Sequence, residues 1–253
     1  MWSGDYRYVI SNLVLKDFRV RYRNMSLGML WSLLNPLVMM GVLSFVFTMV
    51  FPSGIPDFPL FVLCGLVPFN FFSVAWISAT VSVVDNVNLV KRVTVPREII
   101  PVAAVLSNCV HLGVQMGLLL SFTLLFGKGV HWSWLWLPVM WALFIPFVCG
   151  VGMLFAAIDV YIRDARYVVE SGNTVLFWLV PIFYGFEQIK PQYAMLYSYN
   201  PLAALVMATR NILMDGVAPA MSLVRNMCLA SAVALVVGWY CFHRMKHRFY
   251  DYL

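Results

Sequence analysis

Seven stretches of this chain contain no charged residue, and most of them are long enough to cross a bilayer. They are residues 24–56, 58–84, 99–127, 129–158, 171–186, 191–209 and 226–243. A helix needs roughly 17–25 residues to cross hydrocarbon, whereas the strands of membrane barrels give alternating segments of about 10 residues. The composition agrees, because 62% of the residues are hydrophobic and 11% are charged, where a soluble domain carries about 25% charged residues. The sequence therefore predicts an all-α membrane protein.

Six transmembrane helices account for both the apolar stretches and the basic residues between them. The predicted spans are residues 29–51, 60–84, 99–126, 133–158, 168–186 and 222–242. Thirteen of the 17 Lys and Arg residues then share one face: Arg7, Lys16, Arg19, Arg21, Arg23, Lys91, Arg92, Arg97, Arg163, Arg166, Arg244, Lys246 and Arg248. The opposite face receives Lys128, Lys190, Arg210 and Arg225. Because cytoplasmic loops are enriched in Lys and Arg, we predict a multi-pass membrane protein with both termini in the cytoplasm.

A helix of a different kind is predicted ahead of the first span, over residues 8–26. Its polar face holds Asn12, Lys16, Arg19 and Arg23, and its apolar face holds Ile10, Val14, Phe18 and Met25. A basic amphipathic helix of this kind lies along the membrane surface. On these residues alone, a simple surface anchor explains it as well as a contact with a partner does.

The stretch 191–209 is long enough to span the membrane, but Pro191, Gln192, Asn200 and Pro201 interrupt it. A seventh span here would also place the C-terminal basic cluster outside. We therefore predict that residues 187–220 form an external connection that re-enters or lies on the membrane. Within it, Asn200 is the expected N-cap and Pro201 the first residue of a short helix that ends near Met214. An ordinary amphipathic interfacial loop is the alternative.

The sequence lacks the motifs of ATP binding, ion coupling and catalysis. It contains no phosphate loop of the form GxxxxGK followed by Ser or Thr. The predicted spans hold essentially no Asp, Glu, Lys or Arg, which ion-driven carriers place near the bilayer midplane. No nucleophile lies beside a base, and the five cysteines lack metal-ligand spacing. We therefore assign no catalytic residue, no metal site and no cofactor to this chain.

Two loops on the predicted cytoplasmic face offer places for a partner to dock. The first, residues 86–98, is short and polar, and Pro96 stops it before the third span. The second, residues 159–167, contains Arg163 and Asp164. Each loop alone is a weak indication of function.

Taken together, these residues resemble the membrane-spanning subunit of type-2 ABC exporters of lipid-linked polysaccharide, the permeases of O-antigen, capsule and teichoic acid. The resemblance covers nearly the whole chain. Its pieces are Lys16-Asp-Phe-Arg-Val-Arg-Tyr22, Ser26-Leu-Gly-Met-Leu-Trp-Ser-Leu-Leu-Asn-Pro36, Gly65-Leu-Val-Pro-Phe69, Lys91 with Val95-Pro-Arg97, Arg163-Asp164, Phe177-Trp178 with Pro181, and Tyr199-Asn-Pro201.

The resemblance implies one transmembrane domain over residues 1–253, working as a homodimer with two copies of a separate ATPase that binds ATP and Mg. The substrate would be a polyprenyl-lipid-linked polysaccharide, O-antigen first among them. Residues 8–26, with Lys16, Arg19 and Arg23, would be the interface helix, and 187–220 the outer gate. Lys91, Arg92, Val95, Pro96, Arg97 and Glu98 would couple to the ATPase, with Arg163 and Asp164 in the second loop. The aromatic residues expected along the glycan passage are Trp178, Tyr184, Tyr193, Tyr197 and Tyr199.

Two alternatives stay open at this point. A permease of the same fold could move capsule, teichoic acid, a drug or a simple lipid. A membrane-embedded polyprenyl-lipid transferase would need acidic metal ligands at the cytoplasmic border, where Asp85 and Asp159 are isolated from each other in the sequence.

Overall fold

The computed structural model describes residues 6–22, 31–92 and 96–252, and every regular element in these ranges is a helix. The α-helices are α1 (Tyr6–Tyr22), α2 (Trp31–Phe45), α3 (Phe58–Asp85), α4 (Val87–Arg92), α5 (Ile99–Leu125), α6 (Trp136–Tyr161), α7 (Ala165–Leu179), α8 (Pro191–Tyr199), α9 (Pro201–Leu213), α10 (Met221–Met245) and α11 (Phe249–Tyr252). Shorter helical turns are η2 (Val46–Val50), η3 (Trp132–Leu135), η4 (Phe186–Gln188) and η5 (Lys246–Arg248).

Five helical stretches are long and apolar enough to cross a membrane. They are Ser32–Val50, Phe58–Asp85, Ile99–Leu125, Trp132–Tyr161 and Met221–Arg248. These five match five of the six predicted spans, so the prediction of an all-helical membrane protein is confirmed at this level.

The predicted fifth span, residues 168–186, differs from the helix that forms there. Helix α7 has 15 residues and ends at Leu179, which gives a length of about 22 Å against a hydrocarbon core of about 30 Å. Val180 takes the extended conformation, with φ −75° and ψ 138°. The physical reason is Pro181, because proline disfavours helical geometry in the residue before it and has no N–H to continue the helix.

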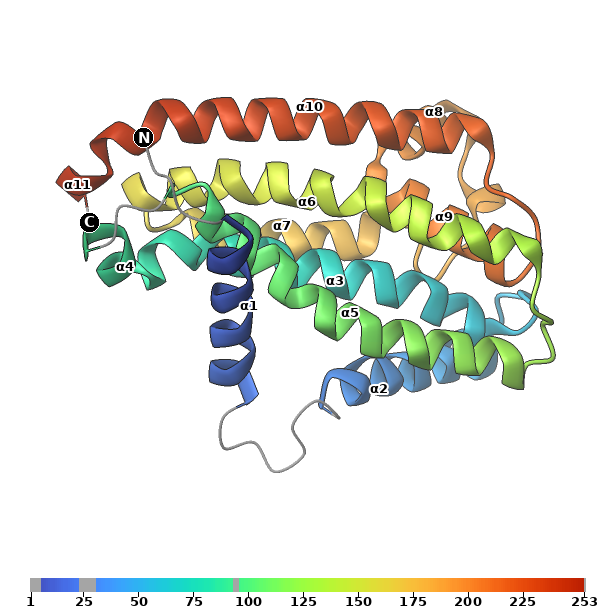
Figure 1. Cartoon of the computed structure of the whole chain (residues 1–253). Helices are drawn as coiled ribbons and strands as arrows, with labels where there is room; N and C mark the ends of the chain where they lie inside the picture. The colour runs from blue at the N-terminus through green and yellow to red at the C-terminus, as the bar shows by residue number, and fades with distance from the viewer. Residues whose placement is uncertain (1–5, 23–30, 93–95, 253) are drawn as a thin grey trace.

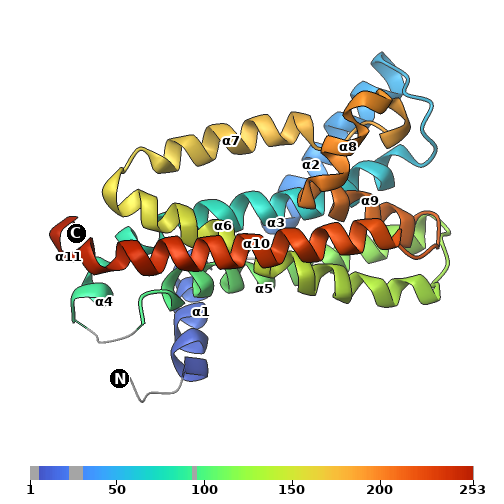
Figure 2. The same cartoon turned by 90° about the horizontal axis from the view of Figure 1, so that it is seen from above.

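The long helices α3, α5, α6 and α10 run side by side, with α3 in the interior of the bundle (Figure 1). Helix α4, α11 and the turn between α6 and α7 lie at one end, which we call the α4 end (Figures 1 and 2). Helices α8 and α9 lie at the opposite end, which we call the α9 end. Helix α1 runs across the long axis of the bundle, and its Leu13 packs with Ile99 and Ala103 of α5.

Helices α6 and α10 approach each other until their backbones touch. The contact is at Gly150 of α6, which lies against Ala234 and Gly238 of α10. A Cβ atom at Gly238 would overlap the carbonyl oxygen of Gly150, and one at Gly150 would overlap the backbone of Ala234. Small residues at such crossings let membrane helices gain van der Waals contact along the backbone. The two helices are therefore fixed to each other at this point.

Helix α9 begins as the sequence predicts. The Asn200 side chain accepts hydrogen bonds from the N–H groups of Leu202 (3.0 Å) and Ala203 (3.4 Å), and Pro201 is the first helical residue. The cap satisfies backbone donors that the helix itself cannot pair. Most of α9 is buried, including Leu202, Leu205 and Ile212, so this short helix is packed into the bundle.

Candidate functional site

The first predicted docking loop, 86–98, is anchored by one residue and exposes another. Val90 of α4 is buried in an apolar cluster with Phe242 and Phe249 of the C-terminal region. Lys91 is exposed. Val95 lies outside the described residues, as does the side chain of Arg92. Among the described cations of α4, Lys91 is therefore the one presented outward.

Arg97 and Glu98 bind the end of α10 and η5. The Arg97 guanidinium donates to the carbonyl of Lys246 (2.6 Å), and Glu98 Oε1 lies 2.5 Å from Lys246 Nζ and 3.3 Å from His243 Nδ1. Burial raises the pKa of Glu98, but its bonds to Lys246 and His243 outweigh this, so the pKa is below its usual value. Glu98 is therefore ionised at neutral pH, and these two predicted coupling residues contact this chain's own C-terminal region. Pro96 beside them is half-buried.

Other predicted basic residues also lie at the α4 end. Lys16 of α1 donates a hydrogen bond to Asn86 Oδ1, next to α4, and Arg19 is exposed. Arg163 and Asp164 are exposed in the turn between α6 and α7. Arg23 lies outside the described residues. Helix α1, where the interface helix was predicted, and both predicted docking loops thus meet at the same end of the bundle, although they are far apart in the sequence.

At the α9 end, Arg210 is a buried cation. Its side chain projects from α9 toward the start of α3, and 7% of the residue is exposed. The guanidinium lies 3.4 Å from the centroid of the Phe61 ring and donates to the carbonyl of Ile182 (2.7 Å) and, more weakly, to that of Phe61 (3.4 Å). No carboxylate within 4 Å is recorded for it in the described part of the chain. Arg210 therefore joins α9, α3 and the segment after α7.

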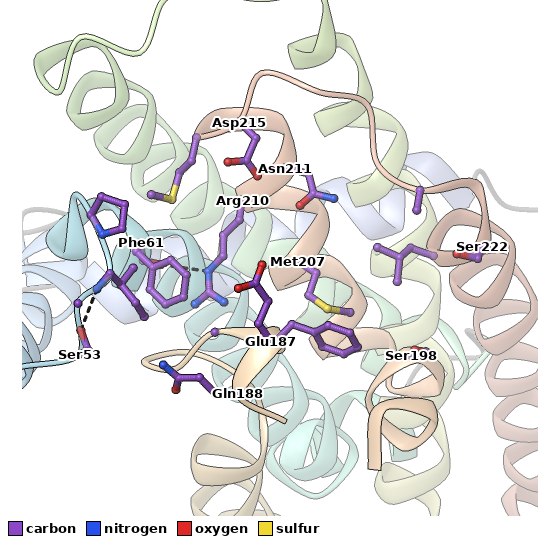
Figure 3. A pocket seen from close by; sticks show the side chains of 18 residues that line it. Ser53, Phe61, Glu187, Gln188, Ser198, Met207, Arg210, Asn211, Asp215 and Ser222 are labelled. Carbon is purple, nitrogen blue, oxygen red and sulfur yellow. Dashed lines mark hydrogen bonds between the residues drawn. The ribbon is translucent and has the colours of Figure 1, made fainter. Parts of the chain in front are cut away.

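A cavity of about 770 Å³ opens beside Arg210 (Figure 3). Its walls come from the connection before α3, from η4, from α9 and from the start of α10. Its polar lining residues are Ser53, Glu187, Gln188, Ser198, Arg210, Asn211, Asp215 and Ser222. The volume lies within the 300–1,000 Å³ usual for small-molecule sites. Charges of both signs, amides and hydroxyls can together bind a polar, hydroxyl-rich ligand.

The five aromatic residues predicted for a glycan passage are not among those that line this cavity. Tyr184 donates to the carbonyl of Leu179 (2.7 Å) and lies 3.2 Å from the hydroxyl of Tyr197. Trp178 contacts Phe183 edge-on and is 61% exposed, and Tyr193 and Tyr199 are also exposed. The structure thus brings Tyr184 and Tyr197 together and leaves three of the five side chains on the outer surface of the subunit.

Two contacts of the structure are not predicted from the sequence: those of the buried Arg210 and the pair formed by Glu98 and Lys246. Arg210 was counted only as a charge on the outer face, although a lone cation inside the apolar stretch 201–213 is a sign of a buried role. The contact between Glu98 and Lys246 joins residues 148 positions apart, and no local pattern indicates such a pair. Among the described residues, no group of three or more His, Cys, Asp or Glu could hold a metal ion.

Comparison with known proteins gives a consistent result. The sequence model of the ABC-2 type transporter family matches residues 8–214. The O-antigen export system permease protein RfbA of Klebsiella pneumoniae is 28% identical over 250 residues, which cover 98% of this chain and 95% of that protein. The protein of the same name from Myxococcus xanthus is 27% identical, over 93% of this chain and 90% of its own length. The polysialic acid transport protein KpsM of Escherichia coli is 26% identical, over 92% and 91%.

Proposed function

Because this chain belongs to the ABC-2 type transporter family, we propose that it is the permease subunit that carries a polyprenyl-lipid-linked polysaccharide, O-antigen first among them, across the inner membrane. The observation that supports this most is its likeness to O-antigen export permeases over 98% of its length. A capsule-type polysaccharide is the second candidate, because a polysialic acid transport protein is 26% identical. A transferase is not favoured, because the relatives that cover more than 90% of this chain are named as an export permease or a transport protein.

In this proposal the energy comes from a separate ATPase, two copies of which serve a homodimer of this chain. The sequence has no phosphate loop with which to bind ATP itself. ATP and Mg are accordingly placed on the partner. The isolated chain should show no ATPase activity.

We place the ATPase at the α4 end, on the cytoplasmic side. Exposed cations from three separate segments gather there: Lys91 after α3, Arg163 and Arg166 after α6, and Arg244 at the end of α10. The positive-inside rule favours the cytoplasm for this end, and exposed charges of one sign speed association with a partner of the opposite sign. Helix α1, which runs across the bundle axis with Lys16 and Arg19 exposed, is suited to lie at the membrane surface beside that partner.

We place the outer gate at the α9 end, in the segment 187–220. Helix α7 and the extended residues that follow it run from the α4 end to the α9 end (Figure 2), so they serve as the fifth of six crossings. The α8 and α9 helices then fill the outer end before α10 returns. Glycan would pass over exposed aromatic faces such as Trp178 and Tyr199, because rings meet the C–H faces of sugars without fixed hydrogen bonds.

The test combines loss of function with a charge reversal. A strain without this chain should keep lipid-linked glycan inside and lack it on the surface, and the wild-type gene should restore export. Lys91→Glu should insert normally but bind less ATPase and export less glycan. The matched control is Arg225→Glu, an exposed arginine at the α9 end, which should bind the ATPase normally. Normal surface glycan in the deletion strain would refute the proposed function.

A further inference from the structure

The end of α10 and the turn η5 are bound to residues far away in the sequence. The Tyr161 hydroxyl donates to the carbonyl of Met245 (2.7 Å), and the Arg97 guanidinium donates to the carbonyl of Lys246 (2.6 Å). The Lys246 ammonium and the His243 ring both contact Glu98 Oε1. Four contacts thus join the last helix to the end of α6 and to the loop before α5.

Apolar packing also holds the same C-terminal region in place. Phe249 is fully buried, and its ring lies 5.4 Å from that of Phe242 and 6.0 Å from that of Tyr161. Both phenylalanines share one buried cluster with Val90 of α4. The C-terminal region thus makes apolar contacts to α4 just before Lys91 in the sequence and polar contacts to Glu98 just after it.

The contact between Lys246 and Glu98 is stronger than a surface ion pair. The side chains are 22% and 17% exposed, and the second carboxylate oxygen of Glu98 is buried and has no hydrogen-bond partner among the described residues. Screening by salt is weak for partly buried pairs. If Lys246 is removed, Glu98 loses its ammonium partner, and an under-paired buried carboxylate is unfavourable. Loss of Lys246 therefore destabilises the present position of the loop more than loss of an exposed lysine does.

We propose that residues 243–252, which we call the C-terminal strut, hold α4 and residues 96–98 in the position that receives the ATPase, with Lys246 as the central positioning residue. This inference rests on the proposed function, because it assigns a task to a region that makes its contacts beside the docking loop. Lys246 itself is turned toward Glu98 and acts through the loop. The partner's contact in this arrangement is Lys91.

Charge exchange provides the sharpest test. Four variants would each be purified with the ATPase in lipid nanodiscs. They are Lys246→Ala, Lys246→Glu, Glu98→Lys and the double exchange that combines Lys246→Glu with Glu98→Lys. The control is Arg225→Ala, which removes an exposed cation near the start of α10, at the α9 end and away from the strut. The backbone carbonyl of Lys246 that Arg97 binds remains in every variant. For each variant, three quantities would be measured: the ATPase concentration for half-maximal assembly, the rate of ATP hydrolysis and the glycan exported per ATP.

We expect Lys246→Ala to raise the half-maximal ATPase concentration about five- to tenfold, as for loss of a partly buried charge contact. Lys246→Glu should raise it further, and the double exchange should recover most of the loss. Arg225→Ala should match the wild type. Melting temperatures separate a positioning role from a general loss of stability. If Lys246 positions the loop, the single variants should bind the ATPase less well even at temperatures where they are completely folded.

Two results would overturn the inference. One is wild-type assembly and hydrolysis in both Lys246 variants. The other is a double exchange no better than the worse single variant. Failure of the wild-type chain to bind any ATPase would instead contradict the proposed function, so the two failures are distinguishable.

Discussion

Replacement of Arg210 tests whether one buried cation fixes helix α9 to the rest of the subunit. The guanidinium lies 3.4 Å from the centroid of the Phe61 ring and 2.7 Å from the carbonyl oxygen of Ile182. A desolvated cation over a ring contributes about 2 kcal/mol, and a short hydrogen bond from a charged donor about 1.5–3 kcal/mol. The weaker bond to the carbonyl of Phe61, at 3.4 Å, adds little.

Arg210→Ala removes both interactions and leaves the Ile182 carbonyl without this donor, which costs a further 1–3 kcal/mol or so. Against this, the variant no longer buries a charge, and that relief amounts to several kcal/mol. The balance is a loss of about 2–4 kcal/mol in the attachment of α9. It corresponds to a roughly 30- to 1,000-fold rise in local opening, since about 1.4 kcal/mol is a factor of ten.

Hydrogen exchange of the α9 amides in the nanodisc-held protein measures this opening directly. Arg210→Ala should speed exchange across 201–213 and leave α6 near Gly150 unchanged. Arg210→Lys keeps the charge without the planar donor fork, so it should fall between alanine and the wild type. Unchanged exchange of α9 in Arg210→Ala would show that the packed apolar side chains alone hold the helix.

Three further predictions concern packing, topology and passage. Gly238→Val should abolish stable insertion or lower the melting temperature sharply, because any Cβ there overlaps the α6 backbone. Gly113→Ala has open space around the new Cβ and should behave as wild type. Equal stability of both variants would contradict the backbone contact. Cysteines replacing Lys190 and Asp215 in a cysteine-free protein should both react with an impermeant thiol reagent from outside, and labelling from opposite sides would reveal a span between them. Trp178→Ala should insert, bind the ATPase and accumulate lipid-linked glycan inside; normal surface glycan would remove this exposed ring from the passage.

Hydropathy predicted the long helices well, because a span is required by the bilayer whatever its neighbours are. The start of α9 was equally readable, since Asn200 and Pro201 act on the backbone beside them. Helix α7 ends at Leu179, before the predicted boundary at residue 186, because Pro181 acts on the backbone of Val180 beside it. A count of uncharged residues does not register that local effect.

The site was harder to predict, because its contacts join residues that are far apart in the sequence. Exposure of Lys91 and of Arg163 followed from their place in polar loops. The roles of Arg97 and Glu98 depend on Lys246, which reaches them only after α5, α6 and α10 have packed. An aromatic side chain in a membrane segment has several possible surroundings, so composition alone could not show that Phe61, rather than the tyrosines, borders the cavity beside Arg210.

The backbone contact between α6 and α10 fixes where along its length α10 sits on the bundle. Helix α10 has 25 residues, which makes a rod of about 37 Å, and Leu223 near its start lines the outer cavity. Its far end leads into the C-terminal strut at Lys246, and Gly238 lies between the two ends. One residue inserted into α10 would turn one end by about 100° relative to the other. The length of this helix therefore sets both the spacing and the relative orientation of the residues at its two ends.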